Sequence, residues 1–242
     1  MISVGVDGCK AGWFSVKLSD NNWEIDIFPD IKALWEKYQD ASLILLDIPI
    51  GLRENSKIER LCDLEARKLL GKRKSSVFPA PCREAVYRDS YEEACDINKN
   101  LTGRGLSLQT WNIMPKIREV DILLSENKNA RSQIREIHPE ICFYAFSGQP
   151  MKYSKNKKEG YSERHDILKK IYPSSKVIIS KALSKYYRKE VAKDDILDAL
   201  SAAITARFGK NNLDSIPKIP ELDSIGLPME MVYKETSCLH SA

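Results

Sequence analysis

The chain has 242 residues, of which 43% are hydrophobic and 30% charged, and its formal net charge is +4. This length suffices for one large domain or for one domain with a sizeable insertion, and the composition is ordinary for a soluble globular protein. The small basic excess is compatible with a phosphate-bearing or nucleic-acid partner, but it excludes a strongly basic tail.

Cysteine usage and hydropathy exclude two further classes. The six cysteines form no CxxC pair and do not cluster with histidine, which argues against structural zinc. No apolar run approaches the roughly 18 residues of a membrane span, and the first residues lack a secretory signal pattern. We therefore expect reduced thiols, a cytoplasmic location and no membrane partner.

The first strand pair is predicted at residues 2–18. Apolar residues alternate in 2–6 and again in 14–18, and the glycines between them indicate a hairpin turn. Asp7 lies at the mouth of this hairpin. Because an isolated buried carboxylate carries a large desolvation penalty, Asp7 is expected either to cap the turn or to act as a ligand. An Asp-Gly pair is itself a common hairpin signal, so both interpretations stay open.

A second aspartate follows a second strand. Alternation predicts a third antiparallel strand at 23–28, and Asp30 is placed to cap a helix that follows. The apolar run 43–46 is typical of a central buried strand, and it ends at Asp47. This order predicts an α/β fold with a mixed sheet in which the first and fourth strands are neighbours. Asp7 and Asp47 would then face each other at the strand ends.

Residues 53–132 are predicted to form a helical insertion without strands of its own. Its first helix, between 58 and 69, should carry Arg60 and Asp63 on its polar side. A long helix over 108–124 is expected to be interrupted at Pro115.

The segment 72–83 within the insertion has five basic residues and two prolines and is expected to be irregular. It is either a phosphate-contacting loop or a solvated connection. Gly71-Lys72 is rejected as a phosphate loop because the upstream glycine and strand of that motif are missing.

The last elements bring further acids. A fifth strand is predicted at 132–138 and is followed by Glu140. A helix at 193–207 carries Asp194, Asp195 and Asp198 on one face. The first two also suit a helix N-terminus, where the macrodipole stabilises carboxylates, whereas Asp198 lies one turn further in. Residues 209–242 are expected to form an irregular extension, so that 1–208 is the domain.

Six short motifs, in order along nearly the whole chain, resemble the DUF429 group of predicted ribonuclease H-like nucleases. They are Val6-Asp-Gly-Cys-Lys-Ala-Gly-Trp13, Asp47-Ile-Pro-Ile-Gly-Leu52, Ala66-Arg67 leading into Lys72-Arg-Lys-Ser-Ser-Val-Phe78, Lys116-Ile-Arg-Glu119, Glu136-Ile-His-Pro-Glu140 and Asp195-Ile-Leu-Asp-Ala-Leu200. The last motif is also similar to the closing helix of Holliday-junction resolvases.

The resemblance implies a ribonuclease H-like fold, with a mixed five-stranded sheet flanked by helices and a helical insertion after the fourth strand. It also implies a nuclease that hydrolyses phosphodiester bonds with Mg²⁺ or Mn²⁺. Hard divalent ions prefer carboxylate oxygens, and two of them about 3.5–4 Å apart neutralise the attacking and leaving oxygens. Because junction resolvases work as dimers, a homodimer is a further expectation.

On this reading the metal ligands are Asp7, Asp47, Asp195 and Asp198, and Glu140 completes the set of catalytic acids. Asp7 would bridge two ions, Asp47 and Asp198 would each complete one site, and Asp195 or Glu140 would add a ligand or orient water. Nucleic acid would be held by basic and hydroxyl side chains, namely Lys10, Arg67, Arg73, Ser75, Ser76, Arg83 and Lys116.

Two other functions remain open. The fold could serve as a non-catalytic module that binds nucleic acid or protein. An actin-like nucleotide phosphotransferase also begins with an aspartate and a glycine after its first strand, but that class needs two copies of the fold, and the sequence shows no internal repeat.

Overall fold

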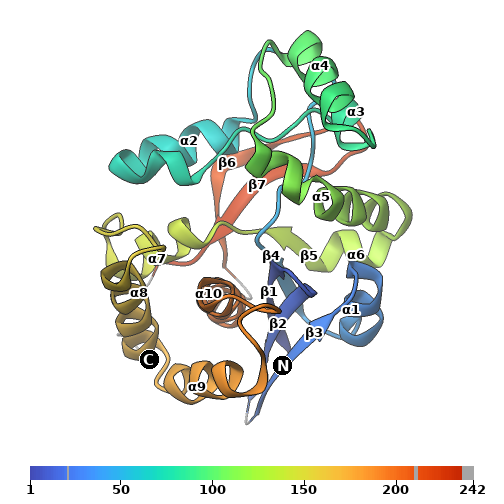
Figure 1. Ribbon diagram of the computed structural model, residues 1–242. Helices are drawn as coiled ribbons and strands as arrows, with labels where there is room; N and C mark the ends of the chain where they lie inside the picture. Colours follow the sequence, from blue (N-terminus) through green and yellow to red (C-terminus); the bar gives the residue numbers. More distant parts are fainter. Residues whose placement is uncertain (21, 210–211, 236–242) are drawn as a thin grey trace.

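The protein is built on one mixed sheet (Figure 1). The computed structural model describes residues 1–20, 22–209 and 212–235. The sheet has the order β3-β2-β1-β4-β5, with β1 antiparallel to β2 and parallel to β4. Its strands are β1 (Ser3–Cys9), β2 (Gly12–Leu18), β3 (Trp23–Phe28), β4 (Leu43–Leu46) and β5 (Ile134–Glu136). This is the expected five-stranded α/β plan, consistent with a ribonuclease H-like fold.

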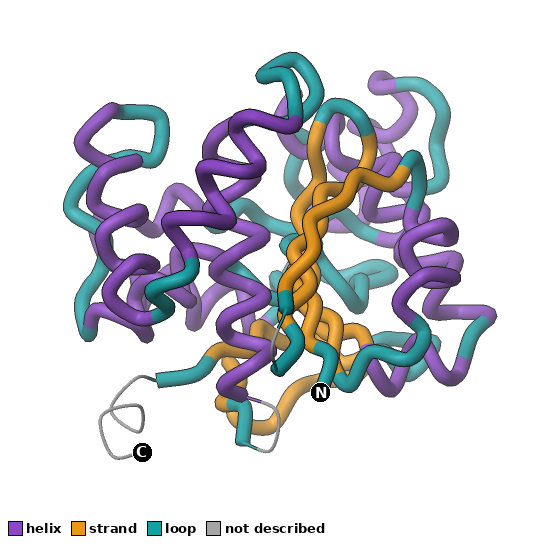
Figure 2. The backbone as a smooth tube through the Cα atoms, turned by 90° about the horizontal axis from the view of Figure 1, so that it is seen from below, coloured by secondary structure: helices purple, strands orange, loops and turns teal. Residues whose placement is uncertain are grey.

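Helices cover both faces of the sheet (Figure 2). One face packs against α1 (Ile31–Tyr38) and α5 (Leu108–Glu126). The opposite face carries α7 (Pro139–Ser147), α8 (Lys158–Ile171), α9 (Ser175–Lys185) and α10 (Lys193–Gly209). Figure 1 shows α10 directly beside β1, with α7, α8 and α9 outside it. Each face therefore has its own hydrophobic core.

The alternation of side chains along each strand decides which residues face α10. In β1, Val4 and Val6 belong to the core on the α1 side. In β4, Leu43 and Leu45 belong to the core on the α10 side. Because successive strand side chains point to opposite faces, continuing this alternation sends both Asp7 and Asp47 toward the α10 side.

Gly5 lets α10 approach β1 closely. A Cβ added at Gly5 would lie 2.0 Å from the Ala203 nitrogen and 2.2 Å from the Ala199 oxygen. No side chain fits in that space, so the backbones of strand and helix are in contact there. The backbone of α10 at Ala199, Ala202 and Ala203 therefore faces β1.

The insertion between β4 and β5 is helical, as expected. In addition to α5 it contains α2 (Leu61–Leu70), the 3-10 helix η1 (Gly71–Ser76), α3 (Arg83–Val86), α4 (Tyr91–Thr102) and α6 (Lys128–Gln133). Because α6 takes residues up to Gln133, β5 is shorter than the predicted strand at 132–138.

Three expectations for the insertion were wrong. Helix α5 continues through Pro115 instead of breaking there. The segment 72–83 is not wholly irregular, because η1 occupies its first part. Arg60 and Asp63 do not face solvent: each is at most 2% exposed, and they pair with each other in the interior.

The C-terminal extension is also more ordered than predicted. Strands β6 (Asp214–Leu222) and β7 (Pro228–Tyr233) pair antiparallel and pack on α2. Pro217 and Pro220 fall where the register between the two strands shifts, so the missing N–H groups do not interrupt a regular ladder. The prolines that suggested irregular structure are therefore compatible with a bulged hairpin.

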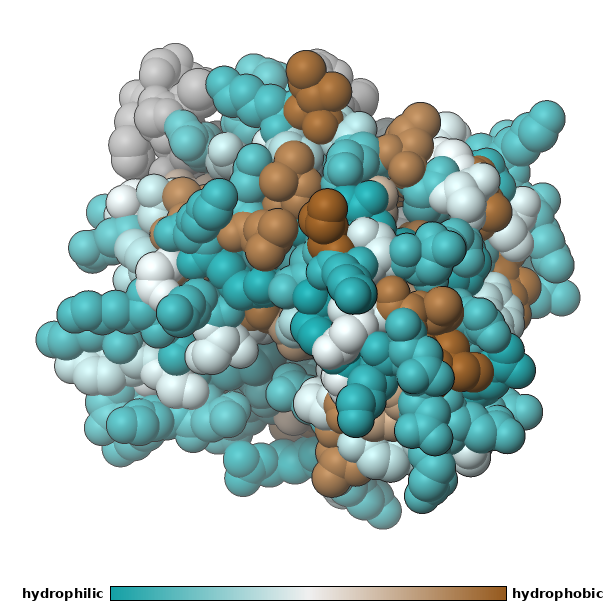
Figure 3. Space-filling model, turned by 90° about the horizontal axis from the view of Figure 1, so that it is seen from above, coloured by the Kyte–Doolittle hydropathy of each residue, from teal (hydrophilic) through white to brown (hydrophobic). Residues whose placement is uncertain are grey.

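Figure 3 shows the surface of the molecule on the side of the insertion and the β6–β7 hairpin. This surface is largely hydrophilic, and its apolar side chains lie in separate small groups. Within the described ranges, no helix combines the length and the apolar composition needed to cross a bilayer.

We expect Gly5→Ala to lower the free energy of unfolding by about 3 kcal/mol, because the added methyl group must push α10 away from β1. Thermal unfolding followed by circular dichroism measures this. Gly105→Ala is the control, since a Cβ there meets only the Cys95 sulfur at an ordinary 3.5 Å. Equal stability of both variants would contradict the close contact between β1 and α10.

Candidate metal centre

Two aspartates lie side by side because their strands are in register. Val6 of β1 pairs with Leu46 of β4, and the next residue in each strand is Asp7 and Asp47. The Asp47 amide donates a hydrogen bond to the Val6 carbonyl over 3.0 Å. The parallel pairing of two short apolar strands thus places both carboxylates at one edge of the sheet.

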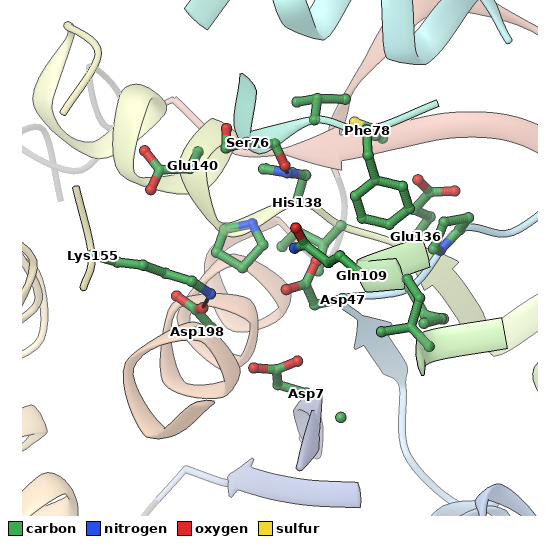
Figure 4. A pocket seen from close by; sticks show the side chains of 18 of the residues that line it. Asp7, Asp47, Ser76, Phe78, Gln109, Glu136, His138, Glu140, Lys155 and Asp198 are labelled. Carbon is green, nitrogen blue, oxygen red and sulfur yellow. Dashed lines mark hydrogen bonds and ion pairs between the residues drawn. The ribbon is translucent and has the colours of Figure 1, made fainter. Parts of the chain in front are cut away.

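Helix α10 brings the third aspartate to the same point. One carboxylate oxygen from each of Asp7, Asp47 and Asp198 lies within 4.8 Å of the others. Figure 4 shows the three side chains pointing toward one another from β1, from the end of β4 and from α10. The predicted convergence of these acids is confirmed, and the donor set consists of hard oxygens, which Mg²⁺ and Mn²⁺ accept.

The cluster has an excess of negative charge. Asp7 is only 8% exposed, and within the described ranges no group donates a hydrogen bond to its carboxylate or to that of Asp47. Burial, followed by repulsion from Asp47, Asp195 and Asp198, raises the pKa of Asp7 well above its ordinary value. Burial, followed by repulsion from Asp198, does the same to the pKa of Asp47. A divalent cation would relieve both effects, so this donor set fits a metal ion.

One cation of the protein already reaches the cluster. Lys155 Nζ lies 2.7 Å from Asp198 Oδ2 and 3.7 Å from Asp194 Oδ2. Attraction to Asp198 raises the pKa of Lys155, so the side chain stays an ammonium. Lys155 belongs to the basic loop 152–158, and nothing in that run of charges distinguished it from its solvated neighbours. Sequence reasoning missed it for this reason.

The two remaining predicted acids lie beside the triad and have partners of their own. Asp195 Oδ2 accepts a hydrogen bond from the Ala192 amide over 2.8 Å, as expected near a helix N-terminus, and burial raises the pKa of Asp195 to about 6. Glu140 pairs with the buried Arg164 and lies 3.5 Å from Arg73. Its second oxygen is buried and has no hydrogen-bond partner among the residues that the structure describes. Both acids line the same cavity but are outside the group of three.

The triad forms part of the lining of a cavity of about 400 Å³. The insertion provides the opposite wall through η1 and α5. Four of the predicted substrate-binding residues line this cavity, namely Arg73, Ser75, Ser76 and Lys116. Lys116 also donates to the Gly12 carbonyl over 2.6 Å and lies over the Trp13 ring, so it ties α5 to the first hairpin.

Three predicted substrate-binding residues lie outside the cavity lining. Lys10 is exposed in the turn between β1 and β2. Arg67 pairs with Glu59 and donates to the Val77 carbonyl. Arg83 pairs with Asp121, Asp223 and Glu54, a cluster that joins the insertion to the C-terminal hairpin. The two arginines are engaged with protein partners, and this placement argues against their predicted contact with phosphate.

A buried ion-pair network beside Asp47 was not predicted. Arg60 contacts both oxygens of Glu136 and both oxygens of Asp63, and it donates to the Ile50 and Gly51 carbonyls. Burial raises the pKa of Glu136 to about 7 despite this pairing. The i,i+3 spacing of Arg60 and Asp63 was visible in the sequence, but their burial depends on Glu136, which is 76 residues away. Through its bonds to Ile50 and Gly51, the network holds the backbone that follows Asp47 in place.

Residues 5–222 match the family described as "Protein of unknown function (DUF429)", and the chain belongs to that family. No curated protein and no solved structure matches the chain. The family membership inferred from the six motifs is thereby confirmed, whereas the activity suggested by the resemblance stays a prediction.

We expect Asp7→Asn to stabilise the metal-free protein at pH 8. Burial raises the pKa of Asp7 in the folded protein above the ordinary aspartate value of 3.8, which applies to the unfolded chain. The free energy of unfolding therefore falls as the pH rises from 3.8 toward the raised pKa of the folded state. The melting temperature of the variant should be about 2–4 °C higher for each kcal/mol gained in the free energy of unfolding. This difference in melting temperature should shrink as the pH falls toward 4. Added Mn²⁺ should stabilise the natural protein more than the variant.

The exposed Asp40 provides the control for this experiment, since Asp40→Asn removes one carboxylate far from the cluster. Melting temperatures from pH 5 to 8, with and without Mn²⁺, check the expectation. An unchanged melting temperature for Asp7→Asn at pH 8 would show that the cluster does not strain the fold.

We further expect Lys155→Met to tighten Mn²⁺ binding about tenfold, the equivalent of 1.4 kcal/mol. The ammonium and the metal ion compete for the Asp198 carboxylate, and methionine removes the competitor while keeping a similar length. Isothermal calorimetry measures the affinity, with Lys157→Met in the exposed part of the same loop as control. Weaker binding in Lys155→Met would mean that Lys155 supports the site.

Proposed function

We propose that this protein is a metal-dependent nuclease that hydrolyses phosphodiester bonds of nucleic acid with Mg²⁺ or Mn²⁺. The observation that carries the proposal is the meeting of Asp7, Asp47 and Asp198 within 4.8 Å, with two of the three carboxylates lacking a donor in the described part of the chain. A buried cluster of like charges is costly unless a ligand compensates it.

Each group in the cavity has a place in this reaction. Asp7, Asp47 and Asp198 would hold the metal, and Asp195 would add a further carboxylate from the lining of the same cavity. When bound, the divalent ions supply an activated water and neutralise the charge on the attacking and leaving oxygens. Water adds to phosphorus and the bond to the leaving oxygen breaks, which yields a phosphomonoester and a hydroxyl group.

The basic and hydroxyl side chains of the opposite wall would position the backbone. Arg73 and Lys116 carry positive charge and Ser75 offers a hydroxyl group, as is usual for groups that contact phosphates, whereas the Ser76 hydroxyl already donates to the Arg73 carbonyl over 2.7 Å. His138 lies between these residues and the acids, and its Nε2 is 3.2 Å from the Ser76 carbonyl. Burial lowers the pKa of His138, so we expect a neutral ring that holds the wall in place.

The ion pair between Lys155 and Asp198 favours the alternative of a non-catalytic binding module. An ammonium 2.7 Å from one acid of the triad supplies part of the compensating charge without a metal ion. The two functions differ in metal uptake: a nuclease needs divalent ions at the triad, whereas a binding module does not.

The test is cleavage of labelled DNA and RNA, single-stranded, duplex and branched, by the purified full chain with Mg²⁺ or Mn²⁺. We expect cleavage of at least one substrate, inhibition by EDTA and loss of activity in Asp47→Asn. The loss should be on the order of a hundred- to a thousandfold, because metal ions supply several kcal/mol of charge stabilisation.

Asp40→Asn is again the matched control and should retain the rate of the natural protein. Equal cleavage by Asp47→Asn and the natural protein would point to a contaminating nuclease. No cleavage of any substrate, together with no metal uptake by calorimetry, would leave the binding module as the better account.

A further inference from the structure

The shape of the cavity bears on what kind of nucleic acid it accepts. At about 400 Å³ it is within the range of pockets that enclose small ligands, whereas a duplex needs a groove open along its length. The insertion is the reason for this limited size, because η1 and α5 stand opposite the acidic triad. In Figure 1 the insertion and the hairpin of β6 and β7 lie above the ends of β1 and β4.

The lining of the cavity includes groups other than acids and bases. The triad and Lys155 form one part of it, and Phe78, Ile113 and Gln109 add an aromatic ring, an apolar side chain and an amide. The paired Glu136 and Arg60 also belong to the lining, and Figure 4 shows Glu136 beside Phe78. Figure 4 shows Phe78 and Gln109 on the side of the cavity away from Lys155. The Gln109 amide has no hydrogen-bond partner within the described ranges, so it is available to a ligand.

The chain holds Phe78 firmly although it lies in a proline-rich segment. Arg67 Nε donates to the Val77 carbonyl over 3.1 Å, and the Ala80 amide donates to Asp63 Oδ2 over 3.2 Å. His138 Nε2 contacts the Ser76 carbonyl. Two side chains of α2, Arg67 and Asp63, and His138 therefore fix the backbone on both sides of Phe78, and Val77 itself is buried against α2. A ring held in this way is preorganised for stacking.

We propose that the cavity takes one unpaired nucleotide of a single strand, with its base against Phe78 and Gln109 and its phosphate at the triad. This inference rests on the proposed nuclease function and names its substrate class. A base stacks on an aromatic ring whatever its identity, and an amide can bond to the edge of an unpaired base. A base inside a duplex has neither its face nor its pairing edge available.

Fluorescence anisotropy of the full chain tests the proposal in Ca²⁺, which takes the same oxygen ligands. The probes are a labelled single-stranded deoxyadenosine 10-mer and the same strand annealed to its complement, with dAMP as competitor. We expect the single strand to bind at least about tenfold more tightly than the duplex, and dAMP to compete weakly.

Substitutions at Phe78 separate stacking from packing. Phe78→Leu keeps an apolar side chain but removes the ring, and it should weaken single-strand binding on the order of tenfold, within the range for one stacked base. Phe78→Tyr should retain the affinity. Leu108→Ala, next to Gln109 but 65% exposed and outside the cavity lining, is the control and should bind normally. Circular dichroism checks that each variant is folded.

Three results would overturn the inference. Equal binding of duplex and single strand, unaffected by Phe78→Leu, would show that the cavity opens into a groove. Equal affinity for dAMP and the 10-mer would make a free nucleotide the occupant. Cleavage with Mn²⁺ is a separate measurement: duplex cleavage would refute this inference while supporting the nuclease, and no cleavage of any substrate together with no metal uptake would refute the nuclease.

Discussion

The site depends on the backbone contact between Gly5 and α10. A helix normally packs on a sheet through side chains, but here the Ala199 oxygen and the Ala203 nitrogen lie where a Cβ of residue 5 would be. This approach brings Asp198, one residue before Ala199, to the end of β1. Strand pairing alone would unite Asp7 and Asp47, because both follow residues that are in register. The third carboxylate, and with it a site able to hold a cation, requires the helix to lie this close.

The electrostatics of the site oppose folding, and the surrounding structure compensates for this. Burial and mutual repulsion raise the pKa of both Asp7 and Asp47. Two well-packed cores surround the cluster, and in the Arg60 network beside it both carboxylates have the guanidinium as a partner. The two neighbouring groups differ in this respect. In the triad, Lys155 pairs with Asp198, whereas Asp7 and Asp47 have no hydrogen-bond donor among the described residues, which suits the triad to a ligand.

The insertion and the C-terminal hairpin add walls to the edge of the sheet and so form a cavity there. Ion pairs engage several of the basic residues that were predicted to bind substrate. Arg83 joins the insertion to Asp223 near the hairpin, and Arg67 supports the segment that carries Phe78. Basic residues around the triad thus fall into two groups. Arg73 and Lys116 line the cavity, whereas Arg67 and Arg83 lie behind its lining and bind other parts of the protein. Only the tertiary partners of these residues distinguish the two groups.

The sequence by itself determined the five strands of the main sheet, most helices, the family and the acids at the strand ends, because local periodicity and residue type are visible without a fold. It did not determine the hairpin of β6 and β7, whose prolines are tolerated only at a register shift, or the burial of Arg60, which depends on Glu136. Nor could it single out Lys155 from a run of exposed lysines, since its partner Asp198 is 43 residues away. Only the tertiary structure decided these features. Each of them depends on a contact between residues far apart in the sequence, and a local sequence pattern carries no information about the energy of such a contact.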